Sequence, residues 1–223
     1  MNTDTRTTTR RPATPVIAAA GYVLSWIVGL LLAPAAPGRD APASQIAAFY
    51  ADHGSAVVLS ALLVHGTAGL ALAVLAVGIA RATGVRAGLR RVVVGTGLTA
   101  ATLSLLQFGL AVSAVIGTHA DTVSRTLRLS IDFVDVIKIA LLAAFVWTAT
   151  TAATRSGTAP QWLRIPAVVL VPLLLVGSAA LVGVEALNPV LAVSLLALLG
   201  WAAAIGHLVA RGATQHPHWS PAA

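Results

Sequence analysis

Residues 57–80 read VVLSALLVHGTAGLALAVLAVGIA, an apolar run in which His65 is the only ionisable side chain. A helix needs roughly 20 mainly apolar residues to cross a bilayer. Backbone polar groups in lipid must be satisfied within the segment, so such a run is helical. Similar runs cover five other stretches: 16–33, 92–117, 131–151, 165–184 and 190–210. The sequence therefore predicts an all-α integral membrane bundle of six transmembrane helices. It occupies residues 16–210 as one domain, with cytoplasmic tails at 1–15 and 211–223.

The composition supports a membrane protein and excludes several other classes. Of the 223 residues, 57% are hydrophobic and 9% are charged, whereas soluble domains carry about 25% charged residues. Cysteine is absent, so disulfides, thiolate nucleophiles and iron–sulfur clusters are excluded. The net charge of +7 comes from arginines that lie between the apolar runs. This placement indicates a topological signal rather than nucleic-acid binding, and we expect no nucleic-acid partner.

The distribution of basic residues predicts the orientation of the bundle. One side would carry ten arginines and the other three, and such an excess marks the cytoplasmic side of a membrane. Both termini are therefore expected in the cytoplasm of a multi-pass plasma-membrane protein. The arginines of the first side are Arg6, Arg10, Arg11, Arg81, Arg86, Arg90, Arg91, Arg155, Arg164 and Arg211, and those of the second are Arg39, Arg125 and Arg128.

The first apolar run has two further features. It follows a basic leader like a secretory signal, but it is longer than the usual 7–15 residues of such a signal, which favours a retained helix. Gly21, Ser25 and Gly29 also form a face of small residues. Such faces let another helix approach closely. The neighbour is either a helix of the same chain, a membrane-protein partner or a second copy.

Two segments outside the apolar runs are also expected to be helical. Ile46, Phe49 and Tyr50 share one helix face, which either lies in the membrane interface or packs on the helix ends. Residues 118–130 contain neither glycine nor proline. The fourth transmembrane helix is therefore expected to begin near Asp121 and to project beyond the bilayer.

A stripe of charges on the fourth helix is the strongest indication of chemistry. Asp132, Asp135 and Lys138 fall on one side at 100° per residue, and Lys138 is the only lysine. A charge at mid-bilayer costs on the order of 3 kcal/mol. Asp135 is placed to pair with Lys138. The stripe either neutralises itself to hold the bundle together, binds a solute or relays protons, or faces another subunit.

Other polar residues are predicted at a similar depth, in the outer half of the bilayer. They are His65 in the second helix, Gln107 in the third and Glu185 at the turn between the last two. Together with Asp132, Asp135 and Lys138, they predict a polar pocket that opens to the outside.

Cofactor and enzyme chemistry find little support in the sequence. His65 and His207 differ in depth by roughly 13 Å, which is too far for both to bind one haem iron. No His-Glu-x-x-His motif supports a metal site, and no nucleophile–base pair is visible. We therefore expect no cofactor, no bound metal and no catalytic residue.

One segment carries a family resemblance. The stretch IAAFYADH at residues 46–53, followed by a long apolar helix that ends in Arg81, resembles small multi-pass bacterial membrane proteins. The resemblance is strongest to actinobacterial proteins of this kind, which form a domain-of-unknown-function family. The resemblance implies a small bacterial plasma-membrane protein. Two functions are expected from the residues: binding or transport of a small solute or protons, or a non-catalytic accessory role in which the charges pair with each other or with a partner helix.

Overall fold

The computed structural model describes residues 14–38, 40–117 and 121–215. The tail arginines Arg6, Arg10 and Arg11, the loop residue Arg39 and the end of the C-terminal tail lie outside them. The described part consists of helices and their connections and contains no strand. Its elements are α1 (Thr14–Leu32), α2 (Ala43–Ala61), η1 (Leu62–Thr67), α3 (Ala68–Ala82), α4 (Ala87–Ile116), α5 (Asp121–Arg155), η2 (Gln161–Leu163), α6 (Arg164–Gly177), η3 (Ser178–Val182), η4 (Glu185–Leu187) and α7 (Asn188–Gln215).

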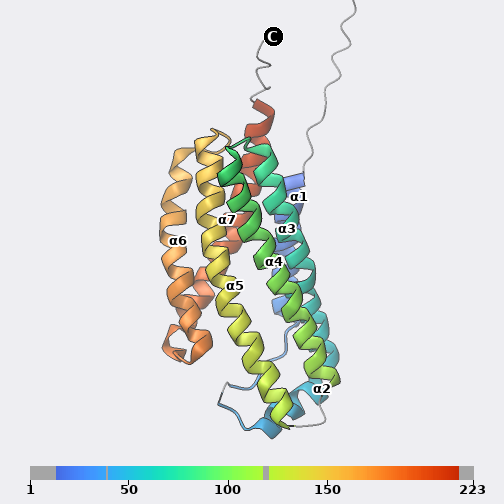
Figure 1. Cartoon of the computed structure of the whole chain (residues 1–223). Coiled ribbons are helices and arrows are strands. Elements are labelled where there is room, and N and C mark those ends of the chain that lie inside the picture. Colours follow the sequence, from blue (N-terminus) through green and yellow to red (C-terminus); the bar gives the residue numbers. More distant parts are fainter. Residues whose placement is uncertain (1–13, 39, 118–120, 216–223) are drawn as a thin grey trace, which may run out of the picture.

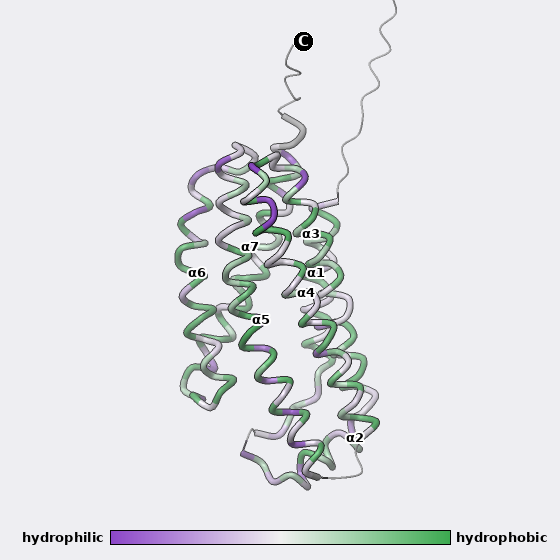
Figure 2. The backbone as a smooth tube through the Cα atoms, viewed as in Figure 1, coloured by the Kyte–Doolittle hydropathy of each residue, from purple (hydrophilic) through white to green (hydrophobic). Residues whose placement is uncertain are grey.

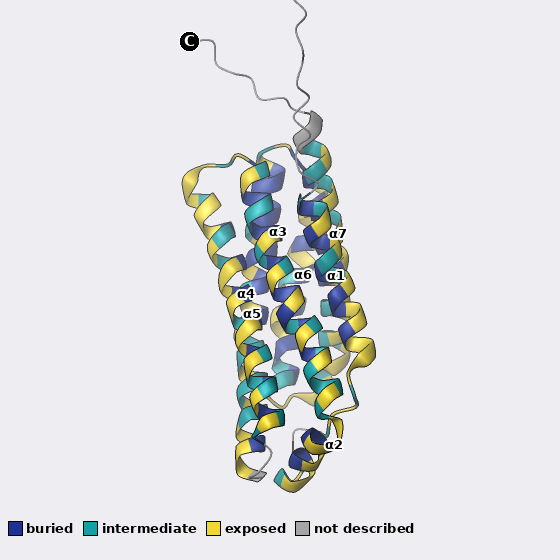
Figure 3. Cartoon of the chain, turned by 90° about the vertical axis from the view of Figure 1, so that its right-hand side faces the viewer, coloured by how far each residue is buried: buried dark blue, intermediate teal, exposed yellow. Residues whose placement is uncertain are grey.

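Six helices form a closed ring in chain order (Figure 1). The neighbours run α1, α3, α4, α5, α6 and α7, and α7 packs back against α1. Buried positions run along the helix sides that face the middle of the bundle (Figure 3). There the rings of Phe145 and Trp201 meet edge to face at 5.7 Å, and the indole of Trp201 donates a hydrogen bond to Thr150. The predicted all-α bundle is confirmed.

Five helical stretches are long and apolar enough to cross a membrane: Thr14–Leu32, Ala43–Ala82, Ala87–Ile116, Gln161–Val182 and Glu185–Gly212. The sixth helix of the ring, α5, carries the charged stripe. The start of α1 and the end of α7 lie at the same end as the α3–α4 and α5–α6 connections, where hydrophilic colouring gathers (Figures 1 and 2). The large hydrophobic side chains on the outside of this ring are what a lipid environment requires.

The second helix differs from the prediction in its length. The predicted interfacial segment near Ile46 and the predicted span 57–80 belong to one helical stretch of 40 residues, Ala43–Ala82. At 1.5 Å per residue it is roughly 60 Å long, about twice the bilayer core. Hydropathy could not show this continuity, because it marks where a helix enters lipid and not where the helix begins.

Three helices extend together beyond the hairpin that joins α6 and α7 (Figure 1). In this extension Ile46, Phe49 and Tyr50 of α2 are buried with Ala114 of α4, and Leu127 of α5 packs against them. Of the two arrangements expected for this apolar face, packing on the helix ends is therefore the one found. α5 begins at Asp121, which confirms the predicted start of this helix.

The small-residue face of α1 is used within the chain. A side-chain carbon added at Gly29 would lie 2.5 Å from Val64 of η1, and one added at Gly21 would lie 3.8 Å from Ala71 of α3. Ser25, between them, is buried. The neighbour of this face within the chain is thus its own second helical stretch.

Gly97 and Gly95 of α4 offer a matched pair for testing the packing of the ring. A carbon at Gly97 would lie 2.4 Å from the Cβ atom of Ala76, whereas nothing lies within 4 Å of one at Gly95. We expect Gly97→Ala to lower the free energy of unfolding by about 1–3 kcal/mol through overpacking. Gly95→Ala should leave it unchanged or raise it slightly, because alanine favours the helix. Equal effects of the two variants in detergent unfolding would contradict the close α3–α4 contact.

Candidate functional site

Lys138 is the centre of a polar cluster inside the bundle. The residue is 2% exposed, although its ammonium carries a charge. Its Nζ atom lies 2.5 Å from Asp135 Oδ1, 2.5 Å from Gln107 Oε1 and 3.4 Å from His65 Nδ1. An ammonium has three N–H donors, so each donor has an acceptor within reach. Three elements, α5, α4 and η1, supply these groups.

Gln107 holds the lysine from α4. It is completely buried, and its Nε2 atom donates to the backbone oxygen of Ile131 at 3.2 Å. Both partners fix the orientation of the Gln107 amide. The ammonium of Lys138 can only donate, so the amide oxygen must face it, and the Ile131 carbonyl can only accept, so the amide nitrogen must face that group. Gln107 therefore links Lys138 to the α5 backbone nearly two turns earlier.

His65 reaches the lysine from an unusual helical segment. η1 (Leu62–Thr67) is a π-helix between α2 and α3. Such segments are rare and are frequently found at functional sites. Since Nδ1 faces an ammonium, this nitrogen must accept, and the neutral imidazole carries its proton on Nε2. The imidazole is half-buried, so it is less enclosed than the lysine.

Asp135 is the more open member of the ion pair. Its side chain is 23% accessible, whereas that of Lys138 is 3% accessible. The predicted i, i+3 pairing of the two residues is confirmed. Lys138 itself is enclosed by its neighbours, and the outward opening of the cluster stays a prediction. Asp135 and His65 are thus the members of the cluster that keep accessible surface.

Asp132 belongs to a second pair, further out along α5. Its Oδ1 atom lies 3.5 Å from Nε of Arg128, and Tyr50 of α2 lies beside Arg128. Asp132 precedes Lys138 by roughly 9 Å along the helix axis, so it is not part of the inner cluster. The predicted single stripe is therefore divided into an inner cluster and an outer pair. Tyr50 was predicted only as part of an apolar face, since spacing alone does not reveal its polar contact.

Glu185 lies apart from both groups. It begins η4, in the connection between α6 and α7, and it is exposed. The structure thus brings together four of the six candidate residues, His65, Gln107, Asp135 and Lys138. Within the described residues there is no set of three or more His, Cys, Asp or Glu side chains placed to hold a metal ion.

Fold and site together define a helical bundle, largely of membrane-spanning length, with a neutralised charge cluster inside it. No family model matches the chain, and no curated protein or solved structure matches it either. The interpretation of function therefore depends on the chemistry of the cluster itself.

Proposed function

We propose that this chain is a multi-pass plasma-membrane protein that binds a small solute or protons at the Lys138 cluster. In this proposal all six helices cross the bilayer and both termini are cytoplasmic. The arginine distribution supports this orientation, because Arg81, Arg86, Arg90, Arg91 and Arg155 flank the two connections at one end of the bundle. The cluster then lies in the outer half of the membrane and is approached from outside.

The single observation that carries the proposal is how the donors and acceptors of the cluster are matched. All three donors of the ammonium are taken, and two of the three acceptors, Asp135 and His65, are themselves proton-binding groups that remain partly accessible. A proton on Asp135 removes the charge that neutralises the ammonium, and a proton on Nδ1 of His65 removes its bond to Lys138 and places a second positive charge beside it. Uptake of a proton or another cation therefore has to displace the lysine or its proton. Intramembrane groups coupled in this way are typical of ion and proton pathways.

A second candidate function is a non-catalytic accessory subunit, and one observation favours it. Lys138 is almost wholly buried, with every donor satisfied. A charge pair that is neutralised and hydrogen-bonded inside the bundle can have a purely structural role, in which it fixes the mutual positions of helices. In this case the cluster holds α4, α5 and η1 together and exchanges nothing with the outside.

A proton-flux measurement separates the two functions. The whole protein is reconstituted into liposomes that contain a pH-sensitive dye, and a pH step is applied outside. We expect the wild type to dissipate the gradient faster than empty liposomes, and the double variant Asp135→Asn/Lys138→Met to return to the empty-liposome rate. Asp52→Asn, which changes an exposed carboxylate of α2, serves as the control and should conduct like the wild type.

The double variant is chosen because it removes both charges and so leaves neither one unpaired. Rates are compared per folded protein, measured by size-exclusion chromatography before reconstitution. If the folded wild type and the folded double variant conduct at the same rate, the relay proposal is wrong and the accessory role is favoured.

A further inference from the structure

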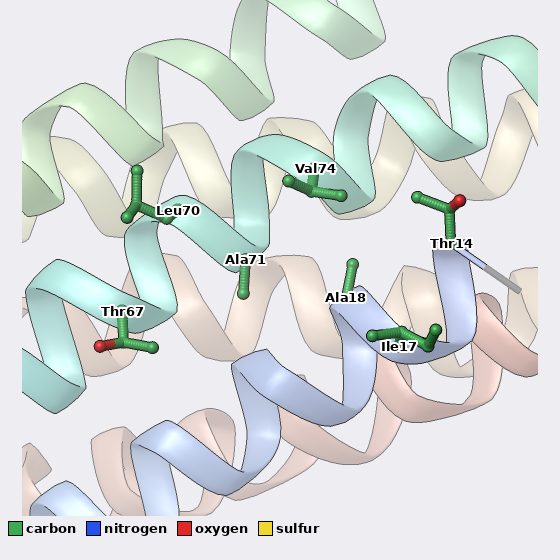
Figure 4. Close-up of a pocket in the computed structure, with 7 residues that line it drawn as sticks. All are labelled: Thr14, Ile17, Ala18, Thr67, Leu70, Ala71 and Val74. Carbon is green, nitrogen blue, oxygen red and sulfur yellow. The ribbon is translucent and has the colours of Figure 1, made fainter.

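A groove lies between α1 and the η1–α3 stretch on the outside of the bundle, and none of its lining residues belongs to the Lys138 cluster (Figure 4). Its volume is about 390 Å³, within the range of ligand-sized sites. Ala18 and Ala71 point toward each other across it, and Ile17, Leu70 and Val74 form its walls. The three larger side chains are 68%, 58% and 46% exposed, respectively. The surface is thus apolar, concave and open to the surroundings of the bundle.

The groove exists because the two helices touch closely on either side of it. Beyond one end, a carbon added at Gly78 would lie 3.3 Å from Pro15, and beyond the other, one at Gly29 would lie 2.5 Å from Val64. Between these contacts, the facing residues Ala18 and Ala71 are too small to fill the space.

A positive charge lies in line with the groove. Arg81 follows Val74 by seven residues, which places it on the same face of α3 two turns further along. It is exposed, and the Gly78–Pro15 contact puts it beside the start of α1. By helix rise, Val74 is about 10 Å and Thr67 about 21 Å from Arg81 along the axis. One leaflet of the hydrocarbon core is about 15 Å deep, so a group held at Arg81 can extend an apolar chain into the groove.

We propose that the α1–α3 groove binds a phospholipid with an anionic headgroup. The phosphate lies at Arg81, and one acyl chain runs between Ile17 and Val74 over Ala18 and Ala71. Arginine recognises phosphate through charge-assisted hydrogen bonds, and basic residues at the membrane surface select anionic lipids. The charge of Arg81, in line with the groove, favours a lipid over a partner helix. A phospholipid headgroup binds such a charge, whereas an apolar helix gains no specific contact from it.

Native mass spectrometry of the full chain tests the site. Delipidated protein in mild detergent is mixed with equal amounts of dioleoylphosphatidylglycerol and dioleoylphosphatidylcholine. We expect the wild type to retain the phosphatidylglycerol about fivefold more, the preference that one arginine near the surface gives. Arg81→Gln should abolish the preference, whereas Arg90→Gln, at the same end on α4, should keep it.

Filling the groove gives an independent readout. Ala71→Leu should reduce retention of both lipids, and Ala144→Leu, at an exposed position on α5, should not. The proposal is wrong if the wild type shows no preference, if Arg90→Gln lowers it as much as Arg81→Gln, or if Ala71→Leu has no effect. It is also wrong if Ala71→Leu only converts a dimer to a monomer, because a second copy would then cover the groove. The proton-flux result for the Lys138 cluster bears on none of these outcomes.

Discussion

Exchanging Asp135 for asparagine is expected to lower the free energy of unfolding by about 3–5 kcal/mol, the cost of breaking a buried ion pair from one side. The carboxylate is 2.5 Å from Nζ of Lys138, and the lysine is 2% exposed. Without that partner, the ammonium either stays charged among neutral groups or loses its proton, and both states are less favourable than the pair. Unfolding in mixed detergent micelles, followed by tryptophan fluorescence, measures the loss.

Two further variants show whether the loss comes from the unpaired lysine. Lys138→Met should cost less than Asp135→Asn, because the remaining carboxylate is 23% accessible and so is less strongly desolvated. The double variant should recover most of the loss, since buried pairs replaced on both sides are often neutral in stability. Additive losses in the double variant would mean that the pair does not act as a unit.

The sequence predicts the helices and the core of the cluster for identifiable reasons. Long apolar runs locate the helices because lipid permits few other structures. The spacing of Asp135 and Lys138 predicts their pairing, because residues three apart share a helix face. His65 and Gln107 could be assigned to the same group because helix rise places them at a similar depth once the order of the spans is known.

Other features depend on contacts that hydropathy and spacing do not encode. Nothing in residues 62–67 distinguishes a π-helix from an α-helix, because the difference is one hydrogen-bond register within an apolar run. The prediction groups Asp132 with Lys138 because both lie on one side of the helix, but at i, i+6 they are too far apart to pair, whereas Arg128 is at i, i+4 and forms the ion pair. Enclosure of Lys138 likewise depends on how closely α4 and η1 approach α5.

The second large effect is expected at Gln107, where leucine should lower the free energy of unfolding by about 2–4 kcal/mol. Leucine has a similar size but leaves one N–H of Lys138 without an acceptor and removes the extra bond to the Ile131 carbonyl, which keeps its helical partner. A buried polar group that loses its partner costs about 1–3 kcal/mol, and the added apolar contact offsets part of the sum. Ser104→Ala, another buried polar position on α4 but outside the cluster, is the control and should change stability little.

Two comparisons identify the cause of the Gln107 effect. Gln107→Glu should cost less than Gln107→Leu, because a protonated glutamic acid still accepts from Lys138 and donates to the Ile131 carbonyl. In a Lys138→Met background, the Gln107→Leu cost should fall by more than half, since the ammonium donor no longer needs an acceptor and the Ile131 carbonyl keeps its helical partner. If the cost is the same in both backgrounds, Gln107 stabilises the bundle by packing alone, and the lysine then depends on Asp135 and His65 for its position.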